Sequence, residues 1–150
     1  MDLAALYDEW VSRLLAYMIS ITRDRHLAED ALQNLFVKLA VSQPEIRNPA
    51  VYLFRAARRE AIRSARRRRM EPLGPLEFLI PVTIPGAPVE LADLTSALGS
   101  LPPEQQEIVI LHGIEGFTFK EAGEIVGAPL ETVASRYRYA IDKLRGLLEP

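Results

Sequence analysis

Seven prolines and glycines fall between residues 72 and 88, and no continuous helix can run through them. On both sides of this segment, apolar residues recur every three or four positions, which is the spacing of helices that bury one face. The sequence therefore predicts an all-α protein with two small helical domains, residues 1–70 and 90–150, joined by a proline-rich linker at 71–89. The linker also carries several large apolar residues, which indicates that it lies in a groove of the protein or of a partner.

Three helices are expected in the first domain, enough to close one small bundle. Asp2 is placed to cap the first helix, whose predicted buried stripe is Leu3, Leu6, Trp10, Leu14, Tyr17, Met18 and Ile21. The second helix follows the Asp24–Arg25 region and ends before Pro44. The third opens with Asn48–Pro49, a cap residue followed by a first-turn proline, and runs to about residue 69.

The second domain carries the pattern of a helix-turn-helix. Helices at residues 90–98 and 104–111 precede it, and the latter is expected to stop before Gly113. Thr118 and Glu121 form a capping box for a short helix, which Gly127 ends in a left-handed cap. A longer helix then begins near Leu130, with an inner stripe of Val133, Tyr137, Ala140, Ile141, Leu144 and Leu148. In this arrangement the longer helix enters the major groove of DNA.

The composition excludes several classes of function. The chain has no cysteine, which rules out disulfides, thiolate zinc sites and thiol nucleophiles. His26 and His112 stand alone, so each is expected to be a surface or partly packed side chain. Without any catalytic or nucleotide-binding motif, we expect no enzyme activity, catalytic residue, metal, cofactor or small-molecule substrate. Without a secretory signal or a membrane-length apolar run, we expect a cytoplasmic location.

The net charge of -2 hides two parts of opposite sign. Residues 1–69 hold 13 Lys or Arg against 8 Asp or Glu, whereas residues 70–150 hold 5 against 12. Eight of the basic residues lie on the third helix, and all eight are arginines, whose guanidinium groups bind phosphates bidentately and stack on bases. This arginine content favours contact of the helix with nucleic acid; the alternative is an ordinary solvated helix face.

Two further polar helix faces are candidates for binding. The residues of the last helix that packing does not use can reach base edges and phosphates. They are Glu131, Thr132, Ala134, Ser135, Arg136, Arg138 and Tyr139. The polar side of the second helix holds Glu29, Asp30, Gln33, Asn34 and Lys38. Taken alone, this face of the second helix is typical of an ordinary solvated surface.

Two segments resemble parts of the small two-domain sigma factors of bacterial RNA polymerase, the extracytoplasmic-function (ECF) subfamily of sigma-70 factors. Residues 28–36 (AEDALQNLF) look like the polymerase-binding helix of that family. Residues 101–105 (LPPEQ) through 132–136 (TVASR) look like its promoter-reading C-terminal domain. The resemblance covers nearly the whole chain apart from the linker.

The resemblance implies a sigma region 2-like first domain, a sigma region 4-like second domain, and a role in directing core RNA polymerase to promoters. It assigns polymerase binding to Glu29, Asp30, Gln33 and Asn34. It assigns holding and melting of the downstream promoter element to Tyr52, Arg55, Arg58, Arg59, Arg63, Arg66 and Arg67. It assigns reading of the upstream element to Glu131, Thr132, Ser135, Arg136, Arg138 and Tyr139. The implied partners are core polymerase, promoter DNA and an anti-sigma factor, and the linker would pass through polymerase towards its RNA-exit path.

The sequence departs from the family pattern at positions that bear on DNA readout. Tyr52, Arg59 and Arg63 stand where the family usually has tryptophan, asparagine and aspartate, and the asparagine belongs to recognition of the melted element. Ala134 replaces a basic residue of the recognition helix. The departures on the third helix leave base-specific readout by the first domain open, whereas Ala134 removes a phosphate contact from the second domain. Two alternatives to a sigma factor stay open. The departures at Arg59 and Arg63 motivate a sigma-like decoy that binds an anti-sigma factor, and the helix-turn-helix pattern also fits a stand-alone regulator.

Overall fold

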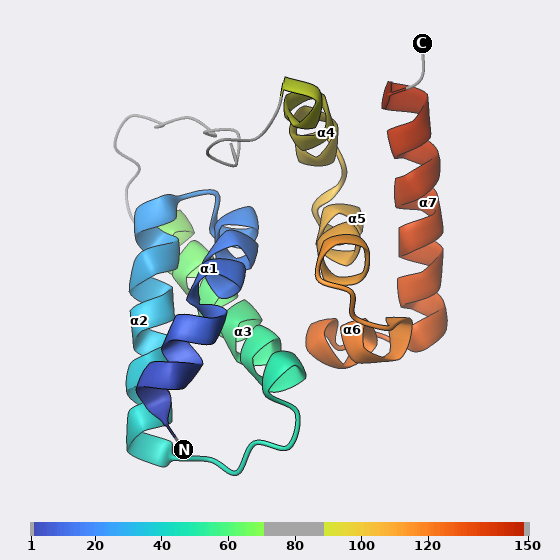
Figure 1. The fold of residues 1–150 in the computed structure, drawn as a ribbon. Helices are drawn as coiled ribbons and strands as arrows, with labels where there is room; N and C mark the ends of the chain where they lie inside the picture. The colour runs from blue at the N-terminus through green and yellow to red at the C-terminus, as the bar shows by residue number, and fades with distance from the viewer. Residues whose placement is uncertain (1, 71–88, 149–150) are drawn as a thin grey trace. The chain divides into compact units, whose positions relative to one another are not determined.

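The computed structural model describes residues 2–70 and 89–148, and every regular element in these two ranges is a helix (Figure 1). The all-α class predicted from the apolar spacing is confirmed. The chain divides into two compact units, with α1 to α3 in the first and the later helices in the second. The predicted linker lies outside the described residues except for Val89, which is the first residue of α4. Among the described helices, none has the length and apolar character needed to span a bilayer.

The described part of the first unit consists of three helices, each of which packs on the other two. They are α1 (Leu3–Thr22), α2 (Arg25–Ser42) and α3 (Pro49–Met70). Two of the predicted cap residues act as caps. Asp2 accepts a hydrogen bond from the backbone N–H of Ala5 (3.1 Å), and Asn48 accepts one from Val51 (3.4 Å). These bonds stabilise the helix starts because the first-turn N–H groups have no partner inside the helix.

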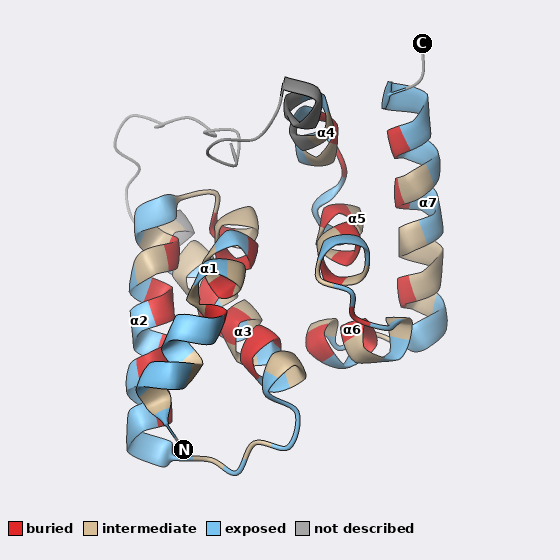
Figure 2. Ribbon diagram, viewed as in Figure 1, coloured by how far each residue is buried: buried red, intermediate tan, exposed pale blue. Residues whose placement is uncertain are grey.

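The core of the first unit lies where the inner faces of its helices meet (Figure 2). Tyr17 of α1 and Phe54 of α3 are fully buried there, with ring centroids 5.2 Å apart. The buried residues of α2 are Ala28, Ala31, Leu32, Leu35, Phe36 and Leu39. The predicted stripe of α1 is buried from Trp10 to Met18. Its outer members, Leu3, Leu6 and Ile21, are only half-buried and lie near the two ends of the helix.

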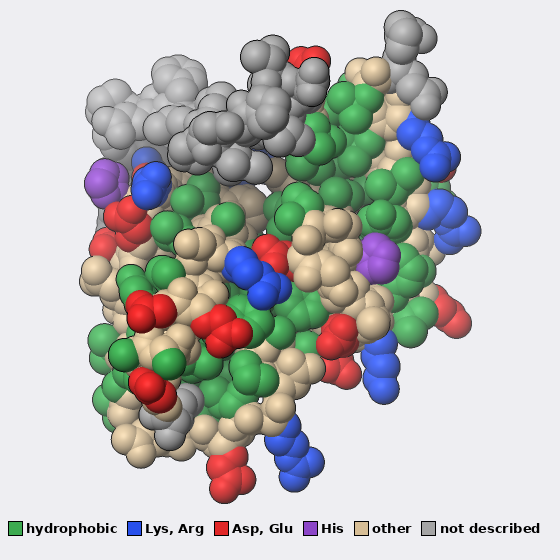
Figure 3. All heavy atoms as spheres, viewed as in Figure 1, with side chains coloured by type: hydrophobic (Ala, Val, Ile, Leu, Met, Phe, Trp, Pro, Cys, Tyr) green, Lys and Arg blue, Asp and Glu red, His purple; other side chains and the backbone are tan. Residues whose placement is uncertain are grey.

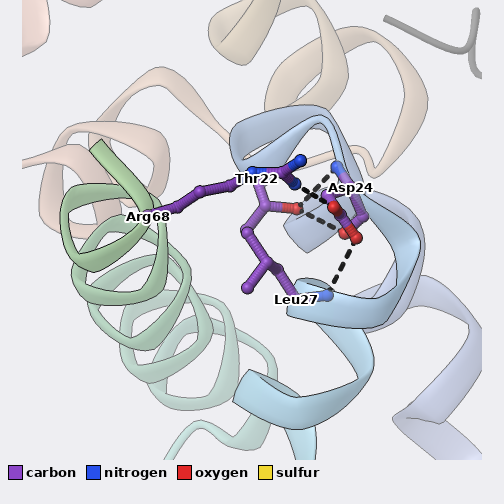
Figure 4. Close-up of polar contacts among 4 residues, drawn as sticks. All are labelled: Thr22, Asp24, Leu27 and Arg68. Atoms are coloured by element: carbon purple, nitrogen blue, oxygen red, sulfur yellow. Dashed lines mark hydrogen bonds and ion pairs between the residues drawn. The ribbon is translucent and has the colours of Figure 1, made fainter. Parts of the chain in front are cut away.

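The corner between α1 and α2 is tied to the last turns of α3 (Figure 4). One carboxylate oxygen of Asp24 accepts a hydrogen bond from the backbone N–H of Leu27 (3.1 Å), and the other pairs with the guanidinium of Arg68. Thr22 Oγ1 donates to the backbone carbonyl of Asp24 (2.9 Å). Burial raises the pKa of Asp24, but its bonds to Leu27 and Arg68 outweigh burial and hold the pKa below the ordinary value of 3.8.

The described part of the second unit holds four α-helices and one π-helix, and the four earlier elements all pack against the long last helix. In chain order, these five elements are α4 (Val89–Gly99), α5 (Pro103–Ile108), the π-helix η1 (Val109–Ile114), α6 (Phe119–Val126) and α7 (Leu130–Leu148). A buried cluster of Ala97, Leu101, Val109, Ala140 and Leu144 joins α4, the connection after it and η1 to α7. Leu148, predicted to belong to the inner stripe of α7, is exposed in the last described turn instead.

The prediction that a helix ends before Gly113 is wrong. The chain widens at Val109 into a π-helix that runs through Gly113 to Ile114. The backbone N–H of Glu115 donates to the carbonyl of Ile110 (2.8 Å), five residues earlier, and Phe117 N–H donates to Leu111 (2.9 Å). These bonds satisfy carbonyl groups that an earlier helix end would leave without partners.

The predicted capping box and glycine cap of α6 are confirmed. Glu121 N–H donates to Thr118 Oγ1 and Thr118 N–H donates to Glu121 Oε1, each at 3.0 Å. Gly127 ends the helix with φ 75°, a left-handed conformation that suits glycine. A Cβ on Gly123 would lie 2.6 Å from the carbonyl oxygen of Ala128, so the turn needs glycine there as well. Short α6, this turn and long α7 therefore form the expected helix-turn-helix.

We expect Asp24→Ala to lower the free energy of unfolding of the first unit by about 1–2 kcal/mol at neutral pH, through loss of the cap and its ion pair. Asp24→Asn keeps a capping side chain and should cost less. Because the pKa of Asp24 is lowered on folding, its stabilisation is present above 3.8 and is lost as the pH falls through the lower folded-state pKa.

Fluorescence of Trp10, the single tryptophan of the chain and a buried residue of the first unit, reports urea unfolding of that unit at each pH. The gap in stability between wild type and Asp24→Ala should shrink in acid. A gap that stays constant well below the ordinary pKa of an aspartate would contradict the role of the carboxylate charge.

Gly123→Ala should destabilise the second unit by roughly 1–3 kcal/mol, because the new Cβ would collide with the backbone of Ala128. Gly146→Ala is the matched control, since a Cβ at that position of α7 meets nothing within 4 Å. Its better helix propensity should stabilise the unit by about 0.5–1 kcal/mol. Thermal unfolding of the full chain, followed by circular dichroism, compares the two. Equal melting temperatures would show that the turn tolerates a side chain.

Candidate nucleic-acid and partner interfaces

Three of the four residues predicted to bind polymerase lie together on α2 and line one surface hollow of about 580 Å³. The hollow is lined by Asp24, His26, Leu27, Asp30, Gln33, Asn34, Ser64, Arg67 and Arg68. Its opposite wall therefore belongs to the last turns of α3. Figure 3 shows basic, acidic and histidine side chains side by side at the end of the first unit where α2 begins.

Glu29, the fourth predicted member, lies apart from the hollow. It is half-buried, and its carboxylate accepts from Arg25 Nε across one helical turn (2.9 Å). Next to Asn34, the same exposed face of α2 continues with two apolar residues. Val37 and Val41 are 61% and 82% exposed. Neither valine was predicted as a contact residue, although two exposed valines four residues apart on a polar helix face are themselves a signal of contact with a partner.

The acidic residue among the arginines of α3 is turned inward. Glu60 is only 5% exposed, and its carboxylate pairs with Lys38 of α2, which the sequence analysis placed on a solvated face. Arg63 reaches the same carboxylate, with 4.0 Å between its Nη1 and Oε1 of Glu60. The pairing with Lys38 supplies the opposite charge that a buried carboxylate needs. Because Glu60 is buried, it leaves the outer face of α3 basic.

The residues predicted to hold the downstream promoter element follow one side of α3. Tyr52 and five arginines are exposed at steps of one, three or four residues, namely Arg55, Arg59, Arg63, Arg66 and Arg67. Arg58 is half-buried. Arg55, Arg59, Arg66 and Arg67 form no hydrogen bond or ion pair with another described residue. Arg55 and Arg66 are separated by about 16 Å along the helix axis, so the row offers an extended cationic surface.

The residues predicted to read the upstream element lie outside the packed face of α7. Val133 and Ala140 are fully buried and hold the helix to its unit. Thr132, Ser135 and Arg136 are half-buried, whereas Glu131, Arg138 and Tyr139 are exposed, Tyr139 at 65%. Arg138 Nη2 donates to Ser135 Oγ (3.3 Å). All six side chains thus remain at the surface of the described part of this unit, where a DNA groove can reach them.

Three aromatic rings, one each from η1, α6 and α7, pack against one another. The ring of His112 stacks on Phe119 of α6 (4.1 Å between centroids) and meets Tyr137 of α7 edge-on (4.6 Å). Its Nδ1 lies 2.7 Å from the carbonyl oxygen of Phe117, so Nδ1 carries the proton and donates. His112 is thus a partly packed side chain that fixes α6 and α7 against η1. In the described part of the chain, no three His, Asp or Glu residues form a metal-binding group.

Comparison with known proteins assigns a family to both units. The family model of sigma-70 region 2 matches residues 6–71, and that of sigma-70 region 4 matches residues 97–146. The ECF RNA polymerase sigma factor EcfG of Rhodopseudomonas palustris (strain TIE-1) is 30% identical over 147 residues, covering 92% of this chain and 80% of that protein. ECF sigma factor SigM of Bacillus subtilis (strain 168) is 28% identical, covering 96% and 95%.

A solved structure has the same fold. The sigma factor RpoE from Bartonella quintana, in complex with the anti-sigma factor NepR, superposes with a TM-score of 0.72 at 27% identity, covering 95% of each chain. The matched segments account for both units, and the relatives are matched over most of their length. The chain belongs to the ECF subfamily of sigma-70 RNA polymerase sigma factors.

Proposed function

We propose that this protein binds core RNA polymerase through α2, holds the opened downstream promoter element on α3, and reads the upstream element in duplex DNA with α7. As an ECF sigma factor, it directs bacterial RNA polymerase to specific promoters and assists the initiation of transcription. We assign region 2 function to residues 1–70, region 4 function to residues 90–150, and a connecting role to residues 71–89. The protein acts in the cytoplasm, by binding alone and without catalysis.

The observation that carries the assignment of α3 is its row of exposed arginines. Arg55, Arg59 and Arg66 have no acidic partner among the described residues, and Glu60 is buried away from them. Cations spaced along a helix neutralise successive phosphates of a strand, whatever the base sequence. Since Arg59 stands where the family has asparagine, we assign the row to the sugar–phosphate backbone. Tyr52, which is 37% exposed, supplies a ring on which an unstacked base can lie.

The assignment of α7 rests on its place in the helix-turn-helix. The N-terminal residues of a recognition helix are the ones that contact base edges in the major groove. Thr132, Ser135 and Arg136 occupy these turns and are each partly exposed. An arginine can bind guanine O6 and N7 bidentately, which discriminates strongly among bases. Since residues 70–150 are acidic overall, this contact operates best when polymerase holds the unit on DNA.

An anti-sigma factor is a further proposed partner. The Bartonella relative was solved with one bound, and the exposed face of α2 in this chain, with Val37 and Val41, suits a protein partner. Run-off transcription with purified core polymerase on a pool of genomic promoters tests the proposed function directly. Stimulation of a defined subset of promoters is expected. Tight binding of an anti-sigma factor without any binding of core polymerase would instead identify a decoy.

Arg136→Ala should weaken upstream-element binding of the polymerase–sigma complex by about tenfold, since one good base contact contributes about 1–3 kcal/mol. Arg145→Ala is the matched control, because it removes the same charge from the exposed last turn of α7. Binding to promoter fragments with intact and scrambled upstream elements measures the effect. The Arg136 variant should lose the difference between the two fragments, and an equal loss in both variants would contradict base readout.

Arg59→Ala should reduce binding of single-stranded DNA and flatten its salt dependence by about 0.7 in the slope of log K against log salt, the amount expected for one phosphate contact. Arg25→Ala is the control, because Arg25 lies on α2 rather than α3 and is already paired there with Glu29. Titrations with several strand sequences at a series of salt concentrations provide the slopes. If the loss depended strongly on base sequence while the slope stayed unchanged, the backbone assignment would be wrong.

A further inference from the structure

The hollow between α2 and α3 brings together two sets of residues that the sequence analysis kept apart. Asp30, Gln33 and Asn34 were assigned to polymerase, whereas Arg67 was assigned to DNA, yet all four line the same hollow. Some of the charged residues in its walls are paired with each other and others are not. Asp24 and Arg68 neutralise each other within the wall. Asp30 and Arg67 are both exposed and form no hydrogen bond or ion pair with another described residue.

Arg67 therefore has a different setting from its neighbour on the helix. Arg66 is also exposed, but it does not line the hollow. Arg67 lines it together with the unpaired carboxylate of Asp30. A DNA phosphate that approached Arg67 there would meet the negative charge of Asp30, which opposes its binding. A surface that presents both signs of charge is complementary to this wall, and a nucleic-acid backbone is not.

The lining also distinguishes a protein partner from a small ligand. Sites for small molecules are mostly apolar and enclosed, with a few polar groups. Here Leu27 is the one aliphatic member of a lining that otherwise consists of charged, amide, hydroxyl and imidazole groups. On the same face of α2, the exposed Val37 and Val41 extend the surface beyond the hollow. Protein interfaces combine an apolar part with a polar rim, and here the exposed valines would form the apolar part and the hollow the polar rim.

We propose that Arg67 belongs to the polymerase-binding surface rather than to the DNA-binding row. The matching segment of core polymerase presents a basic group to Asp30 and an acidic group to Arg67, with hydrogen-bonding groups between them for Gln33 and Asn34. This inference rests on the proposed role of α2 and extends it to α3. The pair of Asp24 and Arg68 acts as a positioning element, because it fixes the turn of α3 from which Arg67 projects.

The test compares Arg67→Glu with Arg66→Glu in the full-length chain. The two variants carry the same change of charge on adjacent residues, so any general electrostatic effect is shared. Affinity for core polymerase is measured without DNA, and affinity for single-stranded DNA is measured without polymerase. Arg67→Glu should weaken polymerase binding by tenfold or more, whereas Arg66→Glu should change it by less than about threefold. Arg66→Glu should weaken DNA binding more than Arg67→Glu does.

Asp30→Ala separates this inference from the proposed function. If Asp30→Ala weakens polymerase binding and Arg67→Glu does not, the role of α2 stands and the assignment of Arg67 is wrong. If Arg67→Glu weakens it and Asp30→Ala does not, the assignment of Arg67 stands and that of Asp30 falls. If neither variant has an effect, both proposals fail. Trp10 fluorescence and circular dichroism confirm that each variant is folded, and Arg67→Lys should retain part of the affinity because it keeps the charge.

Discussion

Two ion pairs hold α3 against the rest of the first unit, and both proposed binding surfaces of that unit depend on them. Lys38 of α2 reaches the buried carboxylate of Glu60, and Asp24 at the α1–α2 corner pairs with Arg68. Since a buried carboxylate is costly without its partner, the first pair fixes the register of the two helices. The first pair holds Glu60 inward, away from the exposed arginines, and so leaves the outer face of α3 basic.

Helix boundaries could be predicted best where the residues that determine them lie close together in the sequence. Thr118 and Glu121 satisfy each other's backbone groups within one turn, so this capping box could be predicted from the sequence. Asp2 and Asn48 could be predicted as caps for the same reason, since each accepts from a backbone N–H three residues later. The π-helix is different. It depends on bonds from Glu115 and Phe117 to carbonyls five and six residues back, and glycine at position 113 alone indicates a break.

The candidate surfaces were predictable in part, for the same reason. Residues on one helix face, such as Asp30, Gln33 and Asn34, follow from spacing alone. Contacts between helices do not, because Lys38 and Glu60 are 22 residues apart and Asp24 and Arg68 are 44 apart. The hollow arises from such contacts. The sequence therefore identified the arginines of α3 as a group but not the different surroundings of each one.

The run of arginines that ends α3 has a consequence for how such a chain can change. Arg66, Arg67 and Arg68 appear interchangeable in the sequence, yet one faces solvent, the next lines the hollow and the third holds Asp24. Each residue turns the helix by about 100°, so inserting or deleting a single residue upstream would rotate all three arginines away from their present surroundings. Substitution by lysine keeps the directions, whereas a length change scrambles them. Natural variation in this helix should therefore tolerate replacement far more readily than insertion.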